Sequence, residues 1–443
     1  MGLGAADVIN YAIREAVIGI NGNDTRYFNE KNGNLDQNEV FTSTYYIYND
    51  ENGYHYNDDV AKAAYANPAT RNKVFVSEPF EKVEADNYAK AATDTLELGD
   101  VVYGVPQTMG FAMMFYRMDV LADLDLAVPE TWNELLSILP TLQSNNMNIG
   151  VSYVLALEYM IYQKGGSMWK YEDESLYDSK YAGAAIDLDS DVALESFEFV
   201  CRLYSDYSFP VSYDASNRFR TGEMPIIIGD YASIYNTLVV YATELDGMWE
   251  FCPLPGSEVI DPETKKVKLE VDRDANGNVI YDANGQPVMK KVLNYNSLAS
   301  VTATVLLHGC DNIKAAWAYL QWQTSASVQA NYGNKMVALI GPSAKYEAAN
   351  RNAIRNLSWT SSEKEAIEDQ MNNLSSIVNY PGSYIMGRYM GFAFLDAVND
   401  GADPVDSLSQ YIDEINDELT RKRKEFNLPT ADQVVMKDTT KKN

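Results

Sequence analysis

The stretch that most constrains the fold is residues 105–135, VPQTMGFAMMFYRMDVLADLDLAVPETWNEL. Its apolar run at residues 111–116 predicts a buried strand. After a short acidic stretch, Thr131 and Glu134 have the spacing of a capping box, in which the two side chains bond the free backbone amides at the start of a helix. A buried strand followed by a capped helix indicates a layered α/β architecture.

The rest of the chain repeats this alternation. Residues 224–228 (MPIII) form a short apolar run that stops at Gly229, which is typical of a buried strand that turns directly into a helix. Apolar residues at helical spacing predict a helix over 191–204. Two Asn-Gly pairs within the polar residues 265–295 predict two successive hairpins, and a further hairpin is expected over residues 40–56.

Three more helix starts are expected from acidic residues that precede an amphipathic pattern. Asp7 and Asp311 are each predicted to cap a helix, and Asp403 with Pro404 begins the last helix. The helices outnumber the strands, so the sequence predicts a helix-rich α/β fold.

Composition excludes several classes of function. The chain has 443 residues, 35 basic against 63 acidic, a net charge of −28, and no basic stripe, so it is not expected to bind nucleic acid. No apolar run reaches membrane-spanning length. Cys201, Cys252 and Cys310 are far apart, which favours three separate core thiols, although one long-range bridge stays open.

The sequence carries little catalytic or metal-binding chemistry. His55 and His308 are the only histidines, so histidine metal sites and a nucleophile–histidine–acid triad are not expected. No catalytic residue, metal site or cofactor is predicted. A weak match to a calcium loop leaves open a structural calcium near Asp272, Asp274 and Asn276, where Ala283 takes the place of the bidentate glutamate.

Several separate stretches, in order, resemble family 1 of the extracellular solute-binding proteins, the maltose-binding-protein-like carbohydrate receptors of ABC importers. Residues 102–106 (VYGVP), 115–121 (FYRMDVL) and 128–135 (VPETWNEL) are similar to the family's first crossing between lobes. The remaining similarities are found in QKGGSMW at 163–169, in FRTGEMPIIIGDY at 219–231 and in AAWAYLQW at 315–322.

The resemblance implies a two-lobed, periplasmic-binding-protein-like fold of type II with an inserted β-hairpin segment. The implied N-terminal lobe is 1–110 plus 297–350, with an insertion near 21–80. The implied C-terminal lobe is 111–296 plus 351–430, with the hairpin insertion near 260–293, and residues 431–443 form a flexible tail. The family's first βαβ unit has no counterpart here, so we expect the chain to be cut after its export signal, within its first lobe.

The resemblance also implies where the ligand binds. Tyr231 is expected to stack on a sugar ring, and Gly165 and Gly166 are expected to allow close backbone approach. Polar side chains at the crossings are expected to bond hydroxyl groups. The full set of predicted ligand-binding residues is Asp7, Gln107, Thr108, Gly165, Gly166, Trp169, Tyr231, Asn294, Tyr295, Tyr384 and Arg388.

The implied function is the capture of a sugar or oligosaccharide between the lobes, followed by delivery to a membrane permease through hinge closure. The expected partners are a saccharide and the transmembrane subunits of an ABC permease, and the protein is expected to be a monomer that is not an enzyme. The expected location is the extracellular face of the membrane, through a lipid anchor, or the periplasm. A glycan-active enzyme and a surface glycan adhesin stay open as alternatives.

Overall fold

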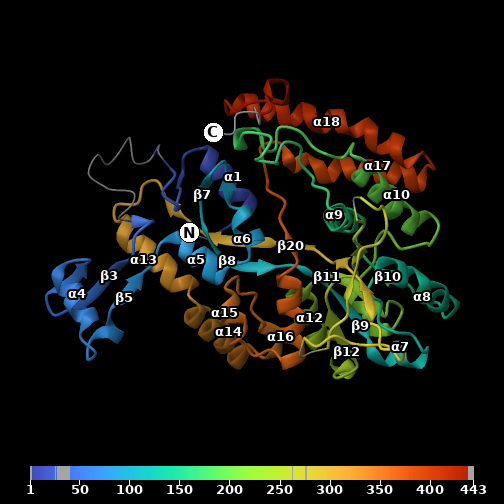
Figure 1. Ribbon diagram of the computed structural model, residues 1–443, viewed down its shortest axis with the longest axis horizontal. Coiled ribbons are helices and arrows are strands. Elements are labelled where there is room, and N and C mark those ends of the chain that lie inside the picture. Colours follow the sequence, from blue (N-terminus) through green and yellow to red (C-terminus); the bar gives the residue numbers. More distant parts are fainter. Residues whose placement is uncertain (1, 25, 27–39, 262, 275–276, 438–443) are drawn as a thin grey trace.

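The computed structural model describes residues 2–24, 26, 40–261, 263–274 and 277–437. Two lobes lie side by side, each built on its own sheet (Figure 1). The first lobe holds a three-stranded antiparallel sheet in the order β1-β18-β8, and helices α1, α13 and α14 pack around it. The bounds of these elements are β1 Gly2–Gly4, α1 Ala5–Ile13, β8 Val105–Gly110, β18 Ser300–Thr304, α13 Ile313–Thr324 and α14 Ala326–Ile340.

The second lobe holds a four-stranded mixed sheet in the order β10-β11-β9-β12. Its helices α17 and α18 pack against each other along the upper edge of the view in Figure 1, and α9 and α10 lie beneath them. The bounds are β9 Ala112–Arg117, α8 Trp132–Ser144, β10 Ile149–Gly150, α9 Tyr153–Gln163, α10 Asp191–Ser205, β11 Ile226–Asp230, α12 Tyr231–Tyr241, β12 Trp249–Cys252, α17 Met386–Asn399 and α18 Pro404–Glu425.

Strand β9 is apolar on both of its faces because both faces are covered. Ala112 and Met114 belong to the core beneath α9, α10 and α17, whereas Met113 and Phe115 belong to the core shared with α12 and the first lobe. Successive side chains of a strand point to opposite faces, so a run such as AMMF needs two packed layers. The strand predicted at 111–116 is therefore confirmed, one residue later than expected.

The predicted helix starts are confirmed in part. Thr131 accepts a hydrogen bond from the Glu134 amide, and Asp403 accepts bonds from the amides of Val405 and Asp406. The Glu134 carboxylate, however, bonds the amide of Glu130 rather than that of the cap residue, so the box is half formed. Two predictions are wrong by a short distance, since α1 is capped at Gly4 instead of Asp7 and α13 at Asn312 instead of Asp311.

Three chain crossings join the lobes. The first runs from β8 through Phe111 into β9, and the second runs through β17 (Ser297–Leu298) into β18. The third begins at β20 (Leu374–Ser375), which pairs in parallel with β17. The hydroxyl of Ser297 donates to the carbonyl of Ala112 and accepts from its amide, at 3.1 Å in both cases, which fixes the first crossing to the second.

One buried glutamine links the crossings further. The side chain of Gln370 has no exposed surface; its oxygen accepts from the amide of Leu254, and its nitrogen donates to the carbonyls of Tyr295 and Asn373. The segments that lead into the second and third crossings therefore move as one unit at this point. The lobe boundaries inferred from the sequence stay a prediction.

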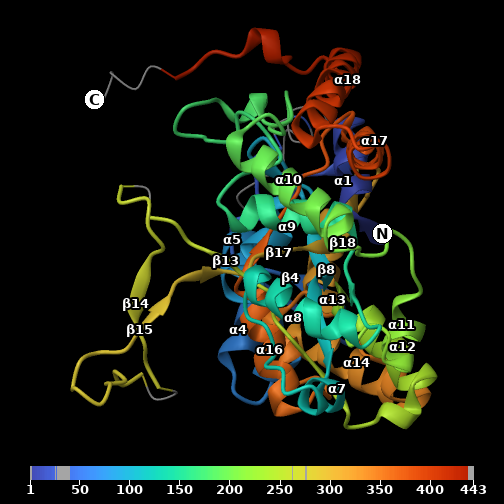
Figure 2. The same ribbon diagram turned by 90° about the vertical axis from the view of Figure 1, so that its right-hand side faces the viewer.

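Two segments lie outside this two-lobed body. The sheet β4-β3-β5 with α4 extends from the first lobe in Figure 1, and the hairpin β14–β15 projects away from the body in Figure 2. The hairpins expected over residues 40–56 and 265–295 are confirmed, although residues 27–39 of the predicted insertion are outside the described residues. The bounds are β3 Tyr45–Asp50, β4 Gly53–Tyr56, α4 Asp59–Ala66, β5 Phe75–Ser77, β13 Ser257–Glu258, β14 Leu269–Val271, β15 Met289–Lys291 and β16 Leu293–Asn294.

Shorter elements complete the layers. Cys201, Cys252 and Cys310 are free thiols; Cys201 is buried in the core as expected, whereas Cys252 and Cys310 are only partly buried. Of the predicted flexible tail, residues 438–443 are outside the described part of the chain, and the Lys437 amide donates to the carbonyl of Leu176 at 2.7 Å. The remaining bounds are β2 Val17–Ile18, α5 Phe80–Asn87, α6 Lys90–Asp94, β6 Glu97–Leu98, β7 Val101–Val102, α7 Met118–Asp123, α11 Ala215–Thr221, β19 Leu306–Leu307, α15 Arg351–Ile354 and α16 Ser361–Met371.

Candidate ligand-binding site

A cavity of about 780 Å³ lies between the two lobes, and we call it the front cleft. The first lobe contributes the start of α1 at residues 4–6 and part of β18. The second lobe contributes one turn of α9 and the end of β11. All three crossings contribute as well, through Phe111, residues 298–299 and the pair Ile377 and Asn379. Ligands of α/β proteins bind at strand ends and between domains, and the front cleft has both properties.

The polar lining of the front cleft is acidic and hydroxylic. Its polar side chains are those of Thr95, Glu158, Tyr159, Asp230, Ser233, Ser300, Thr302 and Asn379. Among the described residues that line it, none is a lysine, arginine or histidine. The cleft therefore offers hydrogen-bond acceptors and negative charge without a basic side chain of its own.

Glu158 and Tyr159 are adjacent residues of α9. The Glu158 carboxylate is partly buried and makes no hydrogen bond or ion pair with any described residue, and burial raises its pKa to about 7. The Tyr159 side chain is only 2% exposed, and its hydroxyl also has no partner among the described residues. Burial and the nearby carboxylates of Glu158 and Asp230 raise the pKa of Tyr159.

Asp230 ends β11 and forms a pair with Glu347. One Asp230 oxygen accepts from the amide of Ser233 at 2.8 Å and so caps α12. Burial and the negative charge of Asp230 raise the pKa of Glu347 to about 8. Two carboxyl groups this close share a proton near neutral pH, because both cannot ionise in contact.

Glycine at position 110 makes room for this pair. A Cβ atom at Gly110 would lie 2.5 Å from an oxygen of Asp230 and 3.1 Å from an oxygen of Glu347. The last residue of β8 must therefore be small for the two carboxyl groups to meet behind the front cleft.

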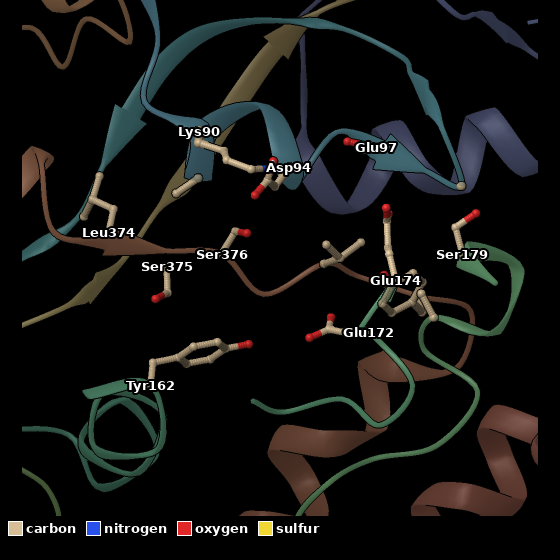
Figure 3. A pocket seen from close by; sticks show the side chains of 15 residues that line it. Lys90, Asp94, Glu97, Tyr162, Glu172, Glu174, Ser179, Leu374, Ser375 and Ser376 are labelled. Atoms are coloured by element: carbon tan, nitrogen blue, oxygen red, sulfur yellow. Dashed lines mark hydrogen bonds and ion pairs between the residues drawn. The ribbon is translucent and has the colours of Figure 1, made fainter. Parts of the chain in front are cut away.

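A second interlobe cavity, which we call the rear cavity, has a volume of about 430 Å³ (Figure 3). The third crossing separates it from the front cleft, since Ile377 and Asn379 line the front whereas Ser376, Val378 and Tyr380 line the rear. This alternation is the two-residue period of an extended chain.

Among the described residues that line the rear cavity, two of the four carboxylates have a partner, namely those of Asp94 and Glu172, whereas those of Glu97 and Glu174 have none. The ammonium group of Lys90 pairs with Asp94 at 2.5 Å, and Glu172 accepts from the Ser167 hydroxyl at 2.6 Å. Glu97 has no such bond, and burial raises its pKa to about 7, but Lys90 lies on the same cavity and partly offsets its charge. Figure 3 shows these side chains arriving from both lobes.

No candidate metal site stands out in the described part of the chain, where no group of three or more His, Cys, Asp or Glu residues could hold an ion. In the projecting hairpin, Asp272 pairs with Lys290 at 3.7 Å and Asp274 accepts from the Asn278 amide. Asn276, the third residue of the weak calcium match, is outside the described residues, so that match stays an untested prediction.

Comparison with known protein families gives one match that covers most of the chain. The profile of the bacterial extracellular solute-binding proteins matches residues 53–330, which is more than half of the sequence. The chain belongs to this family. Its members are binding proteins rather than enzymes, so the prediction that the chain is not an enzyme is confirmed. Among curated protein sequences, none matches the chain significantly.

Solved structures of sugar-binding proteins share the fold of this solute-binding protein. It is similar to the sugar-binding protein MalE from Xanthomonas citri, with a TM-score of 0.60 at 13% identity over 96% of this chain and 85% of that one. For MalE from Listeria monocytogenes in complex with maltose, the TM-score is 0.56 at 14% identity, over 95% of this chain and 84% of that one. For a solute-binding protein from Thermotoga lettingae bound to α-D-tagatose, the TM-score is 0.53 at 16% identity, over 77% of this chain and 80% of that one. The predicted two-lobed fold of type II is confirmed.

None of the predicted ligand-binding residues lines the front cleft, although several are next to residues that do. Asp7 is exposed and follows Ala6, which lines the cleft. Thr108 bonds Thr302, a lining residue, through its hydroxyl. Gln107 instead accepts from Thr304 within the first lobe's sheet.

The structure contradicts the expected stacking role of Tyr231. The ring has no exposed surface and lies 4.7 Å from Phe111 and 5.8 Å from Trp359, measured between ring centroids. Its faces are covered because the chain enters α12 at this residue and turns the side chain into the core. The lining position belongs to the preceding residue, Asp230.

The other predicted residues lie elsewhere in the solute-binding protein. Trp169 is buried against Tyr380, with centroids 5.1 Å apart, and Gly165 and Asn294 line a different cavity beside the base of the projecting hairpin. Gly166 packs on Ile161, and the carbonyl of Tyr295 accepts from Gln370. Tyr384 and Arg388 are exposed, and the Tyr384 hydroxyl bonds Glu418 of α18.

The lining residues that the prediction missed had one visible signal. Glu158 is the only charged residue in the helix YVLALEYMIYQ of residues 153–163. A single acid on an otherwise apolar helix needs a reason to be there, and the cleft supplies it.

Proposed function

We propose that the protein captures a sugar or oligosaccharide in the front cleft and delivers it to the membrane permease of an ABC importer by hinge closure. The observation that carries this proposal is that both lobes and all three crossings line one cavity of about 780 Å³. A rotation of one lobe about the crossings would change the volume of that cavity, because its walls belong to both lobes.

The lining suits a polyhydroxylated ligand. Carboxylates and hydroxyl groups accept and donate hydrogen bonds to sugar hydroxyls, and Phe111 supplies an aromatic side chain at the pivot. The titles of similar structures name maltose and α-D-tagatose as their ligands. The proposal needs no cofactor.

The finer features of the expected function are part of this proposal. Its partners are the transmembrane subunits of the permease, the protein acts as a monomer, and it works outside the cytoplasmic membrane, held by a lipid anchor or free in the periplasm. In the described part of the chain, no helix is both long and apolar enough to cross a membrane.

Calorimetry with a panel of mono- and oligosaccharides, amino acids, peptides and polyamines tests the proposal, with small-angle scattering of each sample. We expect one-to-one binding of at least one saccharide and a fall in the radius of gyration on binding. Binding of peptides or amino acids alone would contradict the sugar assignment. Cleavage of the bound saccharide would contradict the assignment as a transport receptor.

A further inference from the structure

The front cleft holds negative charge that the protein itself does not neutralise. Glu158 and Asp230 line it, Glu347 packs against Asp230, and no basic side chain is among the described lining residues. Hinge closure removes water from such a cleft, and a buried charge without a partner costs several kcal/mol by general estimates. Either a bound proton or a cationic group of the ligand must compensate this charge when the cleft closes.

We infer that the solute carries a protonated amine, which Glu158 and the Asp230–Glu347 pair bind, and that the solute is therefore an aminated sugar. The assignment to a sugar rests on the function proposed above, whereas the positive charge rests on the cleft alone. A neutral sugar would satisfy the hydrogen bonds of these groups but would leave their charge to be compensated by protons alone. An ammonium group does both, because each of its three N–H groups donates to an oxygen acceptor.

Tyr159 is independent support for a ligand at this place. Its side chain is almost fully buried, yet its hydroxyl has no partner among the described residues. The hydroxyl is near both Glu158 and Asp230, whose charges act on it. The hydroxyl oxygen is not among the fully enclosed unpaired atoms of the described residues, so it opens onto the front cleft, where it can bond a polar group of the ligand.

The rear cavity shows that acidity alone does not lead to this inference. It also gathers carboxylates from both lobes, but Lys90 is among its lining residues, and Asp94 and Glu172 already have partners. Glu97 and Glu174 of the rear cavity have no partner among the described residues either, so the difference between the two cavities is the basic group: Lys90 lines the rear cavity, and no basic side chain is among the described residues that line the front cleft.

Three disaccharides that differ at one position per ring test the charge. They are the β1,4-linked dimer of glucosamine, its N-acetylated form and cellobiose, which place an amine, an acetamide and a hydroxyl at the same carbon. Calorimetry at pH 6.5 is expected to show the amine form bound roughly ten- to a hundredfold more tightly than the other two. Putrescine, an amine without a sugar, completes the set.

The outcomes separate this inference from the proposed function. Tight binding of cellobiose or the acetylated dimer, with no preference for the amine, overturns the inference and leaves the sugar receptor standing. Binding of putrescine alone overturns the sugar assignment and supports the cationic cleft. Binding of none of the four overturns the inference, whereas the proposed function is then decided by the wider saccharide panel.

A pair of matched variants tests the residues. Glu158→Gln removes the charge and keeps the shape, and we expect it to weaken binding of the amine form about tenfold or more with no loss for a neutral sugar. Glu172→Gln makes the same change in the rear cavity and is expected to leave binding unchanged. Unfolding curves without ligand verify that both variants fold. Equal effects of the two substitutions would overturn the assignment.

Discussion

The front cleft and the rear cavity lie on opposite sides of one crossing segment, and both collect carboxylates from the two lobes. In the rear cavity, Lys90 neutralises Asp94 and Ser167 bonds Glu172. In the front cleft, Glu158 and the hydroxyl of Tyr159 have no partner among the described residues. Glu97 and the Tyr162 hydroxyl of the rear cavity also have no partner among the described residues, so the presence of Lys90, rather than the number of unpaired groups, distinguishes the rear cavity from the front cleft.

The largest expected effect comes from filling each space in turn. Ser300 lines the front cleft and Ser376 the rear cavity. We expect Ser300→Trp to weaken saccharide binding on the order of a hundredfold or more, because the indole takes the place of the ligand. Ser376→Trp adds the same bulk behind the crossing and is expected not to weaken binding, since the third crossing separates the rear cavity from the front cleft.

Calorimetry of both variants with the ligand found in the saccharide screen measures this contrast. Loss of binding in the Ser376 variant with retention in the Ser300 variant would reverse the assignment of front and rear.

A second effect, of at most about 3 kcal/mol, concerns stability against pH. Burial raises the pKa of Glu158 and that of Glu97 to about 7, from 4.5 in an unfolded chain. The folded state therefore holds both protons more tightly, so the stability that these two groups contribute is fully present below pH 4.5 and is lost as the pH rises through 7. Changing either glutamate to glutamine should flatten its part of this fall.

Urea unfolding between pH 4.5 and 8 measures both variants, first alone and then with the glucosamine dimer. The two glutamates should behave alike without ligand. With ligand, the advantage of Glu158→Gln should disappear, whereas that of Glu97→Gln should persist. If the ligand erased the advantage of Glu97→Gln instead, the rear cavity would be the cationic site.

The smallest expected effect is that of removing one tyrosine hydroxyl group. Two such groups, which both have no partner among the described residues, can be compared. Tyr159 lies on the front cleft, whereas the Tyr231 hydroxyl is enclosed in the core. Removing the first hydroxyl, by Tyr159→Phe, should weaken binding by roughly a factor of 2–12. Tyr231→Phe should leave binding unchanged and raise the free energy of unfolding by about 1 kcal/mol, because a buried hydroxyl without a partner is unfavourable.

Titration calorimetry and urea unfolding of the two variants give both quantities. Weaker binding by the Tyr231 variant, with unchanged binding by the Tyr159 variant, would place the ligand against the Tyr231 hydroxyl and contradict its assignment to the front cleft.

The sequence predicted the architecture well because the architecture depends on periodic apolar patterns and strong helix caps. The two-layer burial of β9 and the cap at Asp403 follow from local residues alone. The ligand-binding residues depend instead on the direction of single side chains at element ends, and there an error of one residue reverses the outcome. Asp230 lines the cleft while Tyr231 is in the core, and Ala6 lines it while Asp7 does not.

Two further features were out of reach of the sequence for a different reason. The pair of Asp230 and Glu347 joins residues that are far apart in the chain, and it depends on the small residue Gly110 on a third segment. The bonds of Gln370 to two other segments are of the same kind. Such contacts arise only after the lobes have formed, so no local sequence pattern predicts them.

The most direct test of the central claim is a crystal structure of the protein with the glucosamine dimer. We expect a closed form in which an amine nitrogen of the dimer lies within about 3 Å of an oxygen of Glu158 or Asp230. A dimer in the front cleft with its amines turned to solvent, or a dimer in the rear cavity, would contradict it.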